Sequence, residues 1–130
     1  MEYSEVLIDT SIIIDYLRKT NKEKTLFWKI INIYECYISS VTVFELYSGA
    51  KESSHHKALD TVLSYLTILP FDKEQAKISS SLFQKLKAKN KLIEFRDIFI
   101  ASSAIAKQIP LATLNKKHFK RIDDLVLIIS

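Results

Sequence analysis

The sequence predicts an α/β fold in three layers, an α/β/α sandwich with helices on both faces of a central, mainly parallel sheet. Short apolar stretches alternate along the chain with longer segments whose apolar residues recur at helical spacing. This order is typical of parallel strands joined by crossover helices. The chain has 130 residues, 48% of them hydrophobic, which is enough to bury a core. We therefore expect one domain over residues 1–130.

The first part of the chain predicts one strand and two helices. Residues 5–8 form a short apolar stretch and are expected to be a buried strand. A helix should follow at residues 11–19, with Thr10 or Ser11 available to cap it. A second helix is expected at residues 24–35. Its apolar positions at helical spacing include Leu26, Ile30 and Ile33.

The middle of the chain repeats this alternation. A strand is expected at residues 36–40, followed by a helix at residues 41–51 that ends near Gly49. Gly49 is the only glycine, so we expect a backbone or packing reason for it. A further helix is expected at residues 56–66. It should lead into a strand at residues 67–70, where a proline stops it.

The last part supplies two helices and two strands. A long amphipathic helix is expected at residues 73–90, and the most apolar helix, at residues 95–108, should be central. A strand at residues 109–115, a helical turn at residues 116–122 and a final strand at residues 125–129 complete the prediction.

Composition excludes several classes of protein. The single cysteine, Cys36, forms no intramolecular disulfide and builds no cysteine zinc site, which suits a reducing cytoplasm. The N-terminus does not resemble a signal peptide. No run approaches the ~20 apolar residues of a membrane span, so we expect a cytoplasmic protein without a membrane segment. The net charge of +4 indicates either an anionic partner or simply solvated lysines.

Three carboxylates stand in apolar surroundings just past a predicted strand or near a helix start: Asp9, Glu45 and Asp97. Each alone is explained by the positive end of a helix dipole. In a parallel sheet, however, all three could meet at the edge where the strands end. Clustered carboxylates repel one another unless a cation balances them, and Mg²⁺ or Mn²⁺ suits such oxygen ligands. The set therefore indicates phosphate-ester chemistry.

Four segments, in order along nearly the whole chain, carry a resemblance to a known family. The chain is similar to PIN-domain proteins, specifically the VapC-type toxins of type II toxin–antitoxin pairs, in "LIDTSIIIDYL", "SSVTVFELYSGA", "EFRDIFIASSAIA" and "IPLATLNKKHFKRIDDLVL". The resemblance implies a Mg²⁺- or Mn²⁺-dependent endoribonuclease on an α/β/α sandwich. It also implies a small antitoxin protein as partner and RNA as substrate.

The resemblance also assigns residues. It implies that Asp9, Glu45 and Asp97 are the family's first, second and third acids, which gather around the metal. Thr10 and Ser11 match the polar pair after the first acid. Many members carry a fourth acid two residues beyond the threonine of "LAT", where this chain has an asparagine. The supporting positions implied around the metal are thus Thr10, Ser11 and Asn115. Asparagine adds no negative charge, so the number of metal ions, one or two, stays open. Asn115 can equally cap the turn that follows it.

Basic residues are candidates for RNA contact. Arg96 precedes the third acid and either holds a phosphate, counterbalances the acids or forms a surface salt bridge. The segment "KKHFKR" offers Lys116, Lys117 and His118, and "KLKAKNK" is a second basic cluster; solvated faces are the alternative for both. The remaining titratable residues lack a ligand pattern or fit exposed positions: Asp15, His55, His56, Asp123 and Asp124.

A protein partner and a homodimer are also expected. An inhibitory segment could present an Arg or Lys to the acids. The early helices carry aromatic residues that either form a groove for an amphipathic helix or belong to the core: Phe27, Trp28, Tyr34 and Tyr47. A helix with two apolar faces also suits a second copy of the chain.

Two other functions remain open from the residues. An aspartyl-phosphate phosphatase or phosphoacceptor domain also places an Asp after its first strand, although the phosphatase pattern has a second Asp where this chain has Ser11. The other is a non-catalytic RNA- or protein-binding domain.

Overall fold

The structure, a computed structural model, describes residues 3–128 and contains one five-stranded sheet with helices on both faces. The strands are β1 (Glu5–Ile8), β2 (Glu35–Ser39), β3 (Thr67–Leu69), β4 (Leu111–Ala112) and β5 (Leu127–Ile128). The helices are α1 (Thr10–Arg18), α2 (Leu26–Ile31), α3 (Ser40–Gly49), α4 (Ser53–Leu63), α5 (Lys73–Ala88), α6 (Phe95–Lys107) and α7 (Lys116–Phe119), with a 3₁₀ turn at Lys22–Lys24. The strand order is β3-β2-β1-β4-β5, and every pairing is parallel.

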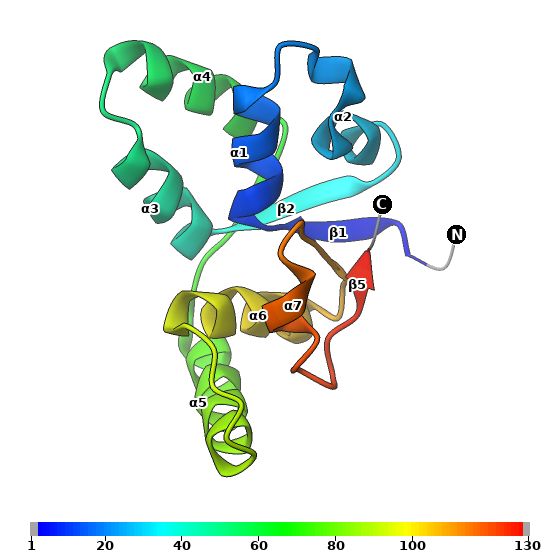
Figure 1. Cartoon of the computed structure of the whole chain (residues 1–130), viewed down its shortest axis with the longest axis vertical. Helices are drawn as coiled ribbons and strands as arrows, with labels where there is room; N and C mark the ends of the chain where they lie inside the picture. The colour runs from blue at the N-terminus through cyan, green and yellow to red at the C-terminus, as the bar shows by residue number, and fades with distance from the viewer. Residues whose placement is uncertain (1–2, 129–130) are drawn as a thin grey trace.

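The sheet separates two hydrophobic cores, as the alternation of side chains along β1 requires. Leu7 packs into a core with residues of α5 and α6, whereas Val6 and Ile8 face a second core built with α1, α2 and α4. In Figure 1, helices α1 to α4 accordingly lie on one side of β1 and β2, and α5 to α7 lie on the other. This arrangement confirms the predicted α/β/α sandwich.

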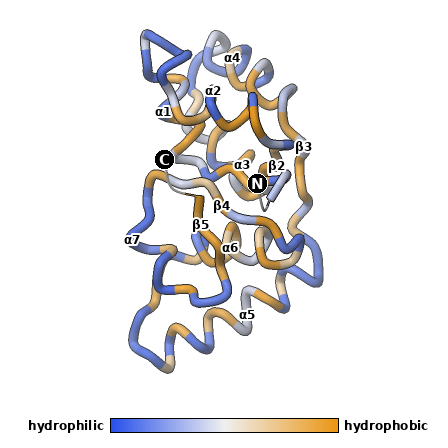
Figure 2. The backbone as a smooth tube through the Cα atoms, turned by 90° about the vertical axis from the view of Figure 1, so that its right-hand side faces the viewer, coloured by the Kyte–Doolittle hydropathy of each residue, from blue (hydrophilic) through white to orange (hydrophobic). Residues whose placement is uncertain are grey.

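The parallel strands bring their C-terminal ends to one edge of the sheet. The helices that follow β1, β2 and β4, which are α1, α3 and α7, therefore start at this edge. Helix α6 runs back before β4, so its first turn lies there too. Figure 2 shows hydrophobic stretches of β4 and β5 in the middle of the molecule and a hydrophilic α7 at its rim.

Several element boundaries differ from the prediction. Helix α2 is shorter than expected, because Thr25 caps it through the Trp28 N–H and the chain turns after residue 31. Ile33 is consequently 56% exposed rather than part of a helix face. Strand β4 has two residues instead of seven, since Pro110 offers no N–H and the chain leaves the ladder at Thr113. The predicted last strand extends to residue 129, which lies outside the described residues.

The expectation for Gly49 is wrong. Its φ is not positive, so no left-handed conformation requires a glycine there. A Cβ built on Gly49 meets no atom within 4 Å, so no close packing requires one either. Gly49 is the last residue of α3, where the helix ends in an extended residue, Ala50.

Candidate active site

Asp9 lies at the centre of the strand-end edge and is tied down by two hydroxyl groups. It is 5% exposed and stands between β1 and α1. Its Oδ2 accepts hydrogen bonds from Ser11 Oγ at 2.8 Å and from Thr113 Oγ1 at 2.7 Å. Among the described residues, none donates a hydrogen bond to Oδ1. One oxygen thus orients the carboxylate, and the other remains available for a ligand.

The prediction that Thr10 or Ser11 caps α1 is wrong. Asp9, not Thr10 or Ser11, occupies the N-cap position, and its side chain makes no capping bond. The Ser11 hydroxyl instead binds Asp9 and accepts the backbone N–H of Leu114 at 3.0 Å. Ser11 thereby links the start of α1 to the loop after β4.

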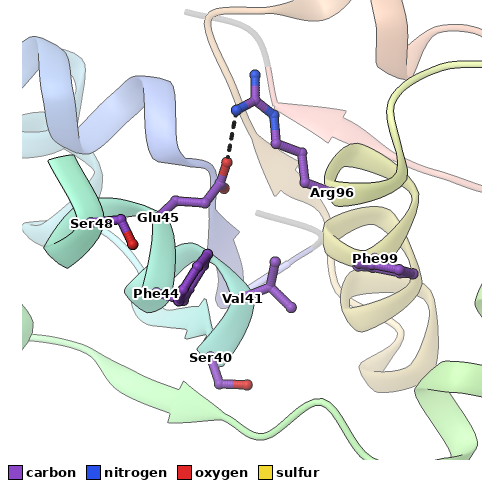
Figure 3. A pocket seen from close by; sticks show the side chains of 7 residues that line it. All are labelled: Ser40, Val41, Phe44, Glu45, Ser48, Arg96 and Phe99. Atoms are coloured by element: carbon purple, nitrogen blue, oxygen red, sulfur yellow. Dashed lines mark hydrogen bonds and ion pairs between the residues drawn. The ribbon is translucent and has the colours of Figure 1, made fainter.

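Glu45 is held by donors on both of its oxygens. It lies in the second turn of α3, and its side chain is 15% exposed. Thr10 donates to Oε1 at 2.9 Å, and Arg96 Nη1 lies 3.0 Å from Oε2. Arg96 also contacts Glu94 through Nε at 3.0 Å. Figure 3 shows Arg96 reaching from α6 across to Glu45 on α3.

Asp97 is the second buried acid of the site, and its charge interacts with that of Asp9. It lies in the first turn of α6. Burial and the neighbouring charge of Asp9 raise the pKa of the Asp97 carboxyl, while His118 and Arg96 oppose this rise. His118 Nδ1 lies 3.4 Å from Oδ2 of Asp97. A carboxyl group whose ionised form is disfavoured in this way is stabilised by any cation placed between it and Asp9.

The donor set fits one divalent ion held by few protein ligands. Asp9 and Asp97 are electrostatically coupled, and each has a carboxylate oxygen to which no described residue donates. Over residues 3–128, no three side chains of the His, Cys, Asp or Glu type lie close enough together to hold a metal ion. Mg²⁺ is commonly bound through one or two carboxylates and retained waters. The geometry thus joins two of the three predicted acids and leaves Glu45 paired with Arg96.

Helix α7 brings further predicted residues to the same place. Asn115 occupies the N-cap position of α7, but its side chain makes no capping hydrogen bond, so the alternative role as a helix cap is wrong. Its Nδ2 lies 3.4 Å from His118 Nδ1, next to Asp97. Lys116 and Lys117 follow Asn115 at the rim, in the hydrophilic turn that Figure 2 displays.

Thr113 is the site residue that the sequence analysis missed. It is fully buried, directly after β4, and it binds Asp9. Its position in "LAT", at the end of a strand that pairs with β1, was the available signal. A lone threonine there looks like a strand residue until the pairing of β4 with β1 is known.

The other basic cluster and the remaining acids lie elsewhere. Lys85 and Lys89 form exposed ion pairs with Asp124 and Asp123, respectively. Asp15 pairs with Lys19 one turn further along α1. Exposed positions were the expectation for these acids; it is confirmed for Asp123 and Asp124, whereas the Asp15 side chain is half-buried, at 23% exposed.

The aromatic residues of the early helices divide into two groups. Phe27 is fully buried and belongs to the core. Trp28 and Tyr34 line a pocket of about 300 Å³ together with Tyr65. Tyr47 donates a hydrogen bond to Asp60 of α4 and does not line that pocket. A four-residue groove is therefore wrong, and two of the four residues remain candidates.

The fold and the site define an α/β/α protein with acidic residues, Asp9 and Asp97, at the ends of its parallel strands. Comparison with known proteins agrees with this class. The PIN domain family model matches residues 6–125. Ribonuclease VapC1 of Methanocaldococcus jannaschii is 34% identical over 123 residues, covering 95% of this chain and 85% of the relative.

Solved structures resemble the chain over nearly its full length. VapBC2 from Rickettsia felis, bound to a promoter DNA fragment, has a TM-score of 0.85 at 28% identity, covering 95% of this chain and 97% of that one. A toxin–antitoxin complex from Klebsiella pneumoniae has a TM-score of 0.75 at 26% identity, covering 93% and 95%. The chain belongs to the PIN domain family and, within it, to the VapC ribonucleases. Within residues 3–128, every helix is too short or too polar to cross a lipid bilayer.

Proposed function

We propose that this VapC ribonuclease is the toxin of a toxin–antitoxin pair and hydrolyses phosphodiester bonds within RNA, using Mg²⁺ or Mn²⁺, as a single cytoplasmic domain. The observation that carries the proposal is the pair of buried acids Asp9 and Asp97 at the sheet edge: their charges interact, and each has one carboxylate oxygen to which no residue of the described chain donates. Membership of the VapC ribonucleases supports the reaction class.

Each residue of the site has a proposed role. Asp9 and Asp97 hold the metal directly, and Glu45 completes the charge of the site, as a metal ligand or through ordered water. Thr10 orients Glu45, whereas Ser11 and Thr113 orient Asp9. A bound divalent ion would polarise the attacking water and offset the charge that develops on the phosphate. No side-chain nucleophile is required, and the one thiol, Cys36, is buried.

RNA would be gripped beside the acids. Lys116 and Lys117 follow Asn115 at the start of α7, where their charges suit backbone phosphates, and His118 already contacts Asp97. Arg96, which precedes Asp97 on α6, has a side chain that is 58% exposed. Contacts of this kind give salt-dependent binding with little sequence preference.

The partner proposed for inhibition is an antitoxin protein. Two of the similar solved structures, VapBC2 from Rickettsia felis and a toxin–antitoxin complex from Klebsiella pneumoniae, support such a partner here. A guanidinium or ammonium group from the antitoxin suits the paired carboxylates of Asp9 and Asp97. The aromatic pocket of Trp28, Tyr34 and Tyr65 offers a site for apolar residues of the same segment.

A homodimer is proposed from an apolar surface on the neighbouring helices α3 and α6. Phe44 is 70% exposed and Phe95 is 62% exposed, and large exposed aromatic groups favour association. Light scattering after size-exclusion chromatography should give twice the chain mass. The double substitution Phe44→Ser and Phe95→Ser should give a monomer of unchanged helix content, and a wild-type monomer at micromolar concentration would contradict the homodimer.

RNA cleavage tests the function directly. Purified protein should cut mixed RNA in Mg²⁺ or Mn²⁺ and stop when EDTA is added. Asp9→Asn and Asp97→Asn should each lower the rate by about 100-fold or more, because each removes an oxygen charge from the site. Asp123→Asn is the matched control, since this exposed acid pairs with Lys89 away from the crevice.

Expression in a host cell tests the toxin role. The wild-type chain should halt growth, and Asp9→Asn should not. RNA cleavage that continues in EDTA would contradict the proposed metal dependence. A chain that neither cuts RNA nor slows growth would instead support the non-catalytic binding function.

A further inference from the structure

Arg96 stands in an unusual position between two acids of different burial. Its Nη1 is 3.0 Å from Oε2 of Glu45, a side chain that is 15% exposed, and its Nε is 3.0 Å from Oε2 of the exposed Glu94. Glu45 lines a pocket beside Arg96, whereas Glu94 is the N-cap residue of α6. Figure 3 shows the guanidinium of Arg96 placed above Glu45 at the rim of a pocket of about 680 Å³.

The two contacts differ in what they require. A carboxylate as buried as Glu45 needs a compensating charge, because an ionised group with few waters is costly without one. The half-exposed guanidinium has no such need, since solvent can hydrate it once released. Arg96 is therefore replaceable at Glu45 by another cation, whereas Glu45 cannot be left without one.

The site is the place where another cation is expected. Within residues 3–128, Asp9 and Asp97 each keep an oxygen to which no side chain or backbone N–H donates, and Thr10 already holds Oε1 of Glu45. The other oxygen of Glu45, Oε2, is held by the permanently charged guanidinium of Arg96. Arg96, whose charge also interacts with Asp97, is thus the group that holds Oε2 of Glu45, the oxygen through which Glu45 would meet a cation bound at the two aspartates.

We propose that Arg96 is a positioning residue that neutralises Glu45 while the site holds no metal, and that a divalent ion displaces it. The displaced guanidinium then turns to a backbone phosphate of the bound RNA, for which its planar pair of donors is suited. The inference rests on the proposed metal-dependent function. It adds that binding of metal and delivery of Arg96 to the substrate are coupled through Glu45.

Calorimetry with Mn²⁺ tests the competition without any RNA. Arg96→Gln should bind Mn²⁺ about three- to tenfold more tightly than the wild type, since a competing unit charge near a divalent ion is removed. Arg18→Gln is the control: it lowers the net charge equally, lies at the far end of α1, and makes no hydrogen bond or ion pair with the described residues. Its affinity should stay within about twofold of the wild type, because the distance screens it.

Arginine side-chain NMR provides a second measurement. The Nε–H resonance of Arg96, assigned from its loss in Arg96→Gln, should shift on titration with Mg²⁺, because release from Glu45 also alters the Glu94 contact. Equal or weaker Mn²⁺ binding by Arg96→Gln, or an Nε–H resonance unchanged at saturating Mg²⁺, overturns the inference while leaving the metal-dependent function intact. A wild-type protein that binds no Mn²⁺ overturns both.

Discussion

Thr113 Oγ1 donates a 2.7 Å hydrogen bond to Oδ2 of Asp9, joining two residues that lie 104 positions apart in the chain. Thr113 Oγ1 also accepts a hydrogen bond from the backbone N–H of Asn115 at 2.9 Å. One buried hydroxyl therefore fixes the first acid and the start of the loop that leads to α7.

Thr113→Val should damage both stability and catalysis. It keeps the shape of the side chain but leaves the Asn115 N–H and one Asp9 contact unsatisfied, at a cost of about 1–3 kcal/mol in the free energy of unfolding. RNA cleavage should fall by about tenfold or more, because Asp9 loses one of its two orienting donors. Thr113→Ser keeps the hydroxyl and should retain most of the cleavage rate. Equal RNA cleavage rates for Thr113→Val and Thr113→Ser would show that the Thr113 hydroxyl does not support the function of Asp9.

Asp97→Asn should change how stability depends on pH in EDTA. The pKa of Asp97 is raised in the folded protein by burial and by Asp9, so the folded state holds this proton more tightly than the unfolded chain. The wild type therefore loses stability relative to Asp97→Asn as pH rises above the ordinary aspartate pKa of about 4. Urea unfolding at several pH values measures the difference. Two curves that stay parallel across this range would show that ionised Asp97 carries no cost.

Asn115→Asp should tighten binding of Mn²⁺. The new carboxylate would lie beside His118 and Asp97 and add a charge to the acidic crevice. Asn21→Asp, beyond the far end of α1, adds the same charge away from the site and should leave the affinity unchanged. Titration calorimetry compares the three proteins. Identical affinities would place Asn115 outside the metal's surroundings.

Cys36 should resist thiol reagents in the folded protein. Burial, with a smaller contribution from Glu35, raises the pKa of the Cys36 thiol to about 12. At pH 8 the reactive thiolate is then only about 10⁻⁴ of the total, and access is also blocked. Reaction with a chromogenic disulfide should be slow in native buffer and fast in 6 M guanidinium. Fast reaction of the native protein would indicate that β2 opens readily.

Local patterns were sufficient for the class of fold. Apolar runs such as residues 5–8 and the helical spacing in α5 and α6 are properties of neighbouring residues, and they predicted the alternation of strands and helices correctly. Boundaries were less certain because capping decides them: Thr25 starts α2, and Pro110 shortens β4. The surroundings of Gly49 could not be predicted at all, since they depend on what packs nearby.

The sequence by itself determined that Asp9 would stand at the end of the first strand and Asp97 at the start of a buried helix. These positions follow from local periodicity and from the direction of parallel strands. Only the tertiary structure decided the partners of each acid. Arg96 reaches Glu45 across 51 residues and Thr113 reaches Asp9 across 104, because α6 and β4 pack beside α3 and β1. Such contacts depend on strand order and register, where a shift of one residue turns a side chain to the opposite face.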